Sequence, residues 1–176
     1  MPRGREIQHD PEELRRRYEK RRGLLKALAA NLERSLVEQL RGVDHIDRIS
    51  FRVKGTSSYL NKVLGHEPPY RAPLVEVEDQ VGGRVLVFFL SGVEIVRQRI
   101  HQVFRPVEGE YRRPPQHTLF QHAYAEPQHD VAYKPAEQLT DDDRRELAWV
   151  AASAWGADQA LERVRARLCP ALPEQR

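Results

Sequence analysis

The stretch IDRISFRVKGTSSYLNKVL, residues 46–64, places a strand pattern directly before a helix pattern. Apolar and polar residues alternate from Ile49 to Val53, which is typical of a strand with one buried face. The alternation slips between Ile46 and Ile49, so we expect a bulge or a later start of the strand there. Thr56 can cap the helix that follows, which we expect to run to the end of this stretch.

A second strand is expected at Arg84–Leu90, where a continuous apolar run indicates burial on both faces. Ser91 can cap the next helix, whose apolar residues recur at helical spacing up to Val103. The segment Arg105–His117 is poor in apolar residues and rich in proline, so we interpret it as a loop.

Long helices are expected at both ends of the chain. The first spans residues 10–42, because Asp10 can cap it and Pro11 suits its first position. The last spans residues 140–169, and its acidic start suits the positive end of the helix dipole. A further helical pattern runs from Thr118 to Tyr133. Trp149 and Trp155 in the last helix are interpreted as packing residues.

These elements predict an α+β fold, with a small mixed sheet covered by helices. Two clear strands are few for a stable sheet, so we expect the sheet to be truncated. One domain over residues 10–169 accounts for the pattern, with a disordered N-terminus at 1–9 and a tail at 170–176.

The composition indicates a cytoplasmic protein. The chain has 176 residues, 40% hydrophobic and 31% charged, which is enough for one modest core. The N-terminus lacks the apolar run of a signal peptide, and the longest apolar run, Val85–Leu90, is too short to cross a bilayer. Cys169 is the single cysteine, so no intrachain disulfide can form. Arginine far outnumbers lysine, which suits contacts to nucleotide or RNA phosphates. The alternative explanation of the arginine excess is codon bias.

A first group of candidate ligands surrounds the strand–helix junction. Arg52 and Lys54 point to the same side at the end of the strand. Ser58 and Lys62 share a face of the helix, since they are four residues apart. Backbone N–H groups near Thr56 favour a phosphate at the helix N-terminus. The group predicts a polyphosphate-binding site, or else a surface turn with ordinary charges.

A second group precedes the second strand, in the sequence EVEDQVGGR, residues 76–84. A carboxylate at a strand edge, such as that of Asp79, can hold Mg²⁺ beside a nucleotide polyphosphate. Arg84 can reach a phosphate or fix the carboxylate. Gly82 and Gly83 permit close backbone approach. The alternative is an acidic loop followed by a glycine turn.

The order and spacing of the two groups resemble the RelA/SpoT family of alarmone synthetases. The family pattern is Arg-x-Lys, a Ser and a Lys on the next helix, and then Asp-x-x-Gly-x-Arg. The resemblance implies a nucleotidyltransferase-like fold in which Asp79 is the catalytic residue and the Mg²⁺ ligand. It also assigns five residues to the ATP site: Arg52, Lys54, Ser58, Lys62 and Arg84.

The resemblance continues through Thr118–Pro135 and the last helix. It implies a GTP pyrophosphokinase of alarmone synthesis and the stringent response. Such an enzyme moves pyrophosphate from ATP to the 3′-hydroxyl of GDP or GTP and makes guanosine tetra- or pentaphosphate. Small synthetases of this family assemble through terminal helices, so a homo-oligomer is expected here as well.

The pattern breaks between Tyr111 and Thr118, where the family has two more strands. Their motifs, Gly-Tyr-Arg-Ser-x-His and Glu-x-Gln-x-Arg-Thr, are absent. Aligning the second motif on Thr118 puts Arg113 in place of the second catalytic carboxylate. Glu108 or Glu110 is a candidate substitute, and Tyr111 could stack on the acceptor base.

Three functions therefore remain open. The first is the pyrophosphokinase itself, and the second is a degenerate member that binds a nucleotide or a partner without turnover. The third is a transferase that pyrophosphorylates the 3′ end of tRNA. A basic cluster on the first helix would then contact RNA, although such a cluster is also typical of a solvated face. Its members are Arg15, Arg16, Arg17, Lys20, Arg21 and Arg22.

Overall fold

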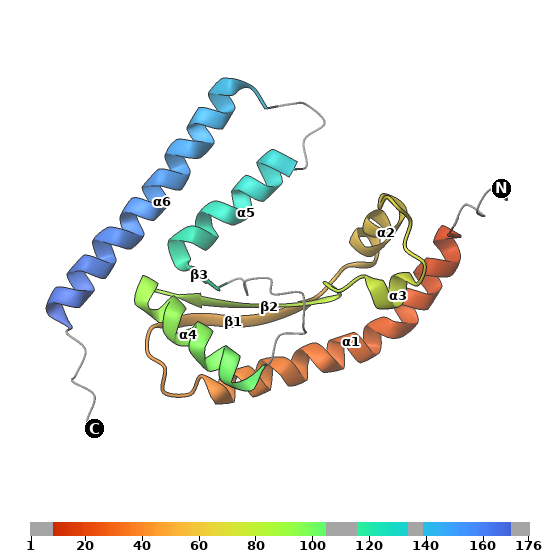
Figure 1. Cartoon of the computed structure of the whole chain (residues 1–176), viewed down its shortest axis with the longest axis horizontal. Coiled ribbons are helices and arrows are strands. Elements are labelled where there is room, and N and C mark those ends of the chain that lie inside the picture. The colour runs from red at the N-terminus through yellow and green to blue at the C-terminus, as the bar shows by residue number, and fades with distance from the viewer. Residues whose placement is uncertain (1–8, 105–115, 134–138, 170–176) are drawn as a thin grey trace, which may run out of the picture. The chain divides into compact units, whose positions relative to one another are not determined.

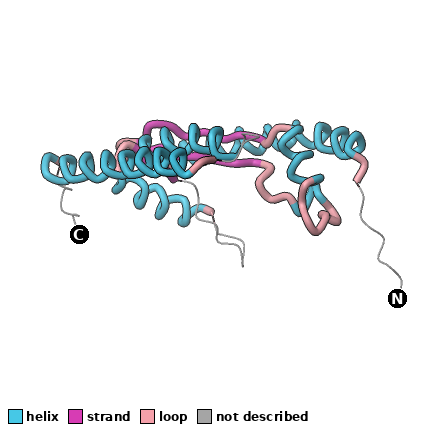
Figure 2. Tube along the Cα trace, turned by 90° about the horizontal axis from the view of Figure 1, so that it is seen from above, coloured by secondary structure: helices cyan, strands magenta, loops and turns pink. Residues whose placement is uncertain are grey.

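The structure, a computed structural model, describes residues 9–104, 116–133 and 139–169. Residues 1–8 of the N-terminus predicted at 1–9 lie outside these residues, as do the tail at 170–176 and the segment 105–115. In chain order the elements are α1 Pro11–Gln39, β1 Ile46–Val53, α2 Thr56–Leu64, α3 Pro73–Glu76, β2 Val81–Val87, α4 Leu90–Val103, β3 Gln116–Thr118, α5 Leu119–Tyr133 and α6 Asp141–Leu168 (Figure 1). Helices make up most of the described chain (Figure 2).

The three strands form one small mixed sheet in the order β1-β2-β3. β2 and β3 are parallel, with Val85 opposite Gln116. The N–H of Lys54 donates to the carbonyl of Gln80, and that of Phe88 donates to His45, both at 2.9 Å. The end of β1 thus pairs with the start of β2, and the start of β1 with the end of β2, so the two strands are antiparallel. The predicted α+β fold with a small helix-covered mixed sheet is confirmed.

Several predicted boundaries differ from the structure. β1 begins at Ile46, so the later start suggested by the slipped alternation is wrong. β2 begins at Val81 and ends at Val87, three residues earlier at each end than the apolar run indicated. β3 lies where a loop was expected. A strand of three residues is too short to show an alternating pattern in the sequence.

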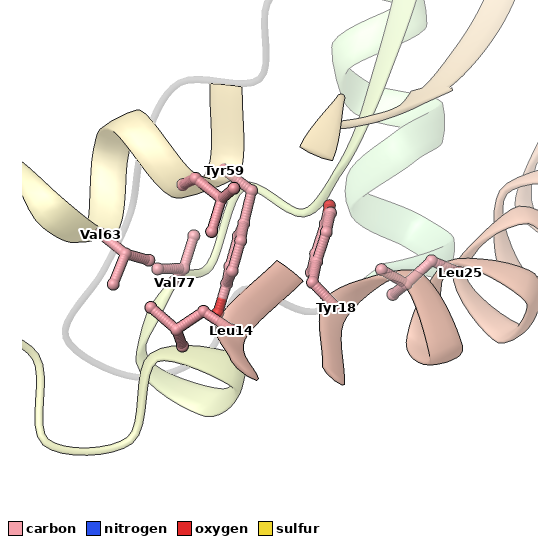
Figure 3. Packing of buried hydrophobic residues seen from close by; sticks show 7 residues of the cluster. Leu14, Tyr18, Leu25, Tyr59, Val63 and Val77 are labelled. Carbon is pink, nitrogen blue, oxygen red and sulfur yellow. The ribbon is translucent and has the colours of Figure 1, made fainter. Parts of the chain in front are cut away.

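The chain consists of two compact units, and the first is Met1–Val37 with Ser50–Gly83. Its core joins α1 to α2 and to the segment before β2. The buried members are Leu14, Tyr18, Leu25, Tyr59, Leu60, Val63 and Val77. The rings of Tyr18 and Tyr59 stack with centroids 3.9 Å apart and planes 2° apart (Figure 3). Both side chains are fully buried, so this pair fixes α2 against α1.

The second unit is Glu38–Ile49 with Arg84–Arg176. A buried hydrogen bond joins β3 to α6, since the Thr118 hydroxyl donates to Oδ2 of Asp158 at 2.7 Å. Thr140 and Asp143 form a capping box at the start of α6, which confirms the predicted helix start. Both Thr118 and Asp158 are buried, so the short strand is held by a specific polar contact.

Ser91 does not cap α4, contrary to the prediction. Phe89 is the N-cap residue and provides no side-chain cap. The N–H and the hydroxyl of Ser91 both donate to Oε2 of Glu162, at 3.1 and 3.2 Å. A carboxylate from α6 therefore supplies the acceptor that α4 needs at its start.

The two tryptophans of α6 are largely exposed. Trp149 is 69% exposed and Trp155 is 63% exposed, so the interpretation of both as packing residues is wrong for the single chain. Among the described helices, none combines the length and the apolar character that a membrane span requires.

Candidate ATP and magnesium site

Three of the residues predicted for the ATP and Mg²⁺ site meet in the first unit. Lys54 follows β1, Lys62 lies in the last turn of α2, and Asp79 precedes β2. Nζ of Lys54 lies 3.0 Å from Oδ2 of Asp79, and Nζ of Lys62 lies 2.7 Å from Oδ1. We call these three residues the Lys54–Asp79–Lys62 cluster. They come from three separate segments, so the fold itself brings them together.

The two lysines stabilise the ionised form of Asp79. Its partial burial on its own would raise the pKa of the carboxyl group, but the hydrogen bonds and charges of Lys62 and Lys54 outweigh burial. The net effect is a pKa below the ordinary value of an aspartate. Asp79 is therefore ionised throughout the neutral range.

Arg52 and Ser58 lie beside this cluster in sequence and are exposed. The side chains of Arg52 and Lys54 are expected on the same side of the sheet, since one residue separates them along the strand direction. Arg52 forms no ion pair with any residue that the structure describes. Ser58 precedes Lys62 by one helical turn on α2. Both side chains are thus accessible to a ligand.

Helix α1 supports the junction, which the sequence did not indicate. The Tyr18 hydroxyl donates to the carbonyl oxygen of Lys54 at 3.0 Å. The prediction that Thr56 is the N-cap of α2 is wrong. Gly55 occupies that position, and the Thr56 hydroxyl donates to the Glu19 carboxylate. This hydrogen bond lowers the pKa of Glu19. In the sequence Tyr18 falls in the apolar stripe of α1 and looks like any other core residue.

Gly83 is needed for packing rather than for a ligand. A Cβ at this position would lie 2.6 Å from Cε1 of Phe51, which is closer than carbon atoms can approach. A Cβ at Gly82 would meet no atom within 4 Å. The close approach expected from the glycine pair therefore occurs at Gly83, against an aromatic ring of β1.

Arg84 belongs to the second unit, where two α5 side chains contact it. Its Nη1 lies 3.0 Å from Nδ1 of His122, and it forms an ion pair with Glu126. A guanidinium can only donate, so Nδ1 accepts and a neutral His122 has its proton on Nε2. Burial and then the Arg84 charge lower the pKa of His122, which keeps the ring neutral at neutral pH. His122 and Glu126 were not predicted as partners of Arg84.

The donor set suits Mg²⁺ that is bound mainly by its substrate. Magnesium in nucleotide sites takes one or two carboxylates, and phosphate and water oxygens complete its shell. Asp79 supplies one carboxylate. No group of three or more His, Cys, Asp or Glu residues that could hold a metal ion occurs in the described part of the chain. Among the described residues the predicted site thus offers Asp79 as its one metal ligand, and a triphosphate would have to supply others.

The acceptor half of the predicted site lies outside the described residues. This applies to Glu108, Glu110, Tyr111 and Arg113. Next to these residues the structure describes Gln116–Thr118, which is β3.

The fold is that of the small alarmone synthetases. Bacillus subtilis small alarmone synthetase 1 bound to AMPCPP is 19% identical, with a TM-score of 0.67 over 91% of this chain and 99% of that chain. Bacillus subtilis small alarmone synthetase 1 bound to its product pppGpp is 16% identical, with a TM-score of 0.66 over 87% and 98%. A GTP pyrophosphokinase family protein from Streptococcus pneumoniae is 20% identical, with a TM-score of 0.62 over 83% and 89%.

No family model matches the chain, and no curated protein matches its sequence. At the identities found, the likeness to solved structures establishes the fold. The fold expected from the RelA/SpoT resemblance is confirmed, and the roles of the individual residues remain predictions.

Proposed function

We propose that this chain is a cytoplasmic GTP pyrophosphokinase domain of the RelA/SpoT type, spanning residues 10–169. It binds ATP with Mg²⁺ and transfers pyrophosphate to the 3′-hydroxyl of GDP or GTP. The main support is the Lys54–Asp79–Lys62 cluster, in which two cations and a carboxylate from separate segments meet within 3.0 Å. Solved structures of the same fold include complexes with AMPCPP and with pppGpp.

Each residue of the site has a defined part in this proposal. Lys54 and Lys62 donate to triphosphate oxygens, and Arg52 can donate two parallel hydrogen bonds to one phosphate. The Ser58 hydroxyl is a further donor on the same helix face as Lys62. Asp79 holds Mg²⁺, which when bound neutralises charge on the triphosphate. Arg84 is assigned to the ATP site by its motif alone.

The proposed reaction has a simple balance of bonds. The guanosine 3′-oxygen forms a bond to the β-phosphorus, and the bond from that phosphorus to the α,β-bridging oxygen breaks. AMP leaves with the bridging oxygen, and the 3′-hydroxyl proton passes to a base. In the family pattern a second carboxylate stands near the acceptor. Here Arg113 takes its place in the sequence, and arginine cannot accept a proton.

The arginine supports a second candidate, a domain that binds nucleotide without turnover. The two functions separate when the chain is incubated with Mg²⁺, labelled ATP and GDP or GTP. Labelled guanosine tetra- or pentaphosphate supports the enzyme, and Asp79→Asn should abolish that product. Protection by ATP against thermal unfolding, without any product, supports the binding domain. If the chain neither binds ATP nor forms product, both proposals are wrong.

Pyrophosphorylation of tRNA is the weaker alternative. Half of the basic cluster on α1 is engaged in ion pairs one turn away, namely Arg15 with Glu12, Arg17 with Glu13 and Arg22 with Glu19. Such pairs are typical of a solvated helix face. Labelled tRNA after incubation with ATP and deacylated tRNA would favour this alternative over the guanosine acceptor.

We also propose self-association through α6. Val150, Leu161, Val164 and Leu168 recur at helical spacing and are between 39% and 70% exposed. The helix is acidic in its first turn and basic in its last, so two antiparallel copies would place opposite charges side by side. Light scattering should give a mass above that of one chain, and Leu161→Glu with Val164→Glu should restore the monomer mass. A monomer at all concentrations would refute this assembly.

A further inference from the structure

Both oxygens of the Asp79 carboxylate are occupied by side chains of the chain itself. Lys62 approaches Oδ1 at 2.7 Å and Lys54 approaches Oδ2 at 3.0 Å. The Lys54 side chain is only 19% exposed, so its charge is partly withdrawn from water and depends on its partner. The carboxylate that is predicted to hold a metal ion is therefore already neutralised from two sides.

This arrangement disfavours a free divalent cation. A cation at either oxygen of Asp79 would displace one ammonium group and remain next to the other. Like charges at this separation repel, and the repulsion is least screened where side chains are partly buried. The three residues together carry a charge of +1, from two lysines and one aspartate. An incoming Mg²⁺ therefore meets net repulsion.

A triphosphate reverses the balance. Its oxygens are better partners for the two ammonium groups than a single carboxylate, because they carry more charge and offer more acceptors. Once Lys54 and Lys62 turn to the phosphates, Asp79 has free oxygens and the surrounding charge is negative. Only in this nucleotide-bound state is binding of a divalent cation by the Asp79 carboxylate favourable.

We propose that Lys54 and Lys62 make Asp79 a metal ligand only in the presence of a polyphosphate, so that the site excludes free Mg²⁺ and accepts it with the nucleotide. The inference rests on the proposed ATP site. It adds that Asp79 competes with the phosphates for the same two lysines. The competition gives Asp79 opposite effects on nucleotide binding with and without metal.

The test measures AMPCPP binding by calorimetry in EDTA and again in Mg²⁺. In EDTA, Asp79→Asn should tighten binding about three- to tenfold, because both lysines are released. In Mg²⁺ the same change should weaken binding, because the metal loses its protein ligand. Glu78→Gln is the matched control, since Glu78 is exposed and forms no ion pair with any described residue. It removes the same charge one position away and should change the affinity in EDTA less than about twofold.

A second measurement follows the metal alone. Electron paramagnetic resonance of Mn²⁺ should show no bound metal with the nucleotide-free chain, and bound metal after AMPCPP is added. Lys62→Gln should allow Mn²⁺ to bind without nucleotide, whereas Lys20→Gln on the exposed face of α1 should not. Thermal unfolding of each variant verifies that it is folded.

The outcomes distinguish the two proposals. If AMPCPP binds in neither EDTA nor Mg²⁺, the ATP site itself is wrong. If AMPCPP binds, but Asp79→Asn weakens it in EDTA or matches Glu78→Gln, the competition for the lysines is refuted. Binding of Mn²⁺ to the nucleotide-free wild-type chain that Asp79→Asn abolishes would refute it equally.

Discussion

The hydroxyl of Tyr18 on α1 donates a 3.0 Å hydrogen bond to the carbonyl oxygen of Lys54, the residue that follows β1. The first long helix thereby holds the backbone of a predicted ATP ligand. The Tyr18 ring stacks on Tyr59, three residues before Lys62 on α2. One buried side chain thus contacts the segments that supply both lysines of the cluster.

Tyr18→Phe should destabilise the chain by about 1 kcal/mol, since it removes one hydrogen bond and keeps the ring stack. It should also weaken AMPCPP binding two- to fivefold, by about 0.4–1 kcal/mol, through a less fixed Lys54 backbone. Tyr59→Phe is the control. The Tyr59 hydroxyl is buried without a hydrogen-bond partner among the described residues, so its removal should be neutral or stabilising. Urea denaturation compares the two, and equal losses would contradict the assignment.

Asp79 should make the stability of the chain depend on pH in the acid range. Its pKa is lowered in the folded state, so its contribution is complete above the ordinary value of 3.8 and is lost as the pH falls through the lower folded value. The contribution should be about 0.5 kcal/mol, the size of a half-exposed ion pair. The free energy of unfolding is measured for wild type and Asp79→Asn between pH 6 and about 2.5. A difference that stays constant with pH would rule out the ion pairs.

Gly83→Ala should destabilise the chain by about 1–2 kcal/mol, because the new methyl group overlaps the Phe51 ring. Phe51→Leu in the same chain should recover part of that loss by making room. Gly82→Ala meets open space and should be neutral or slightly stabilising, since alanine reduces the entropy of the unfolded chain. Thermal unfolding of the three variants tests this prediction. Equal losses of stability at the two glycines would show that a methyl group at Gly83 does not overlap the Phe51 ring.

Thr118→Val should lower the free energy of unfolding by about 2 kcal/mol. The change removes the donor to Oδ2 of Asp158, whose other oxygen already lacks a partner in the described chain. The carboxylate would then be buried with no hydrogen bond at either oxygen. Thr118→Ser retains the hydroxyl, so its free energy of unfolding should fall much less. Denaturant unfolding that gives the same midpoint for both variants would contradict a structural role of this bond.

The sequence allowed prediction of the parts that depend on local spacing. The strand–helix junction brings Lys54 and Lys62 to one place because strand direction and helical repeat fix where each side chain points. The terminal helices, with the acidic start of the last one, follow from equally local patterns. Asp79 was placed through the family resemblance, and the structure pairs it with both lysines.

Several missed features depend on the tertiary environment rather than on local spacing. Arg84 meets His122 and Glu126, which are 38 and 42 residues away, and no spacing rule connects them. Tyr18 was hidden in an apolar stripe, because a hydrogen bond to a backbone carbonyl leaves no mark in the sequence. The exposure of Trp149 was missed because hydrophobicity alone does not say which face of a helix is covered.

A crystal structure of this chain with AMPCPP and Mg²⁺ would locate the nucleotide and the metal. We predict that Nζ of Lys54 and of Lys62 lie within hydrogen-bonding distance of triphosphate oxygens, and that the Asp79 carboxylate coordinates the metal. A nucleotide bound elsewhere, with the ion pairs of Lys54 and Lys62 to Asp79 unchanged, would refute the proposed ATP site.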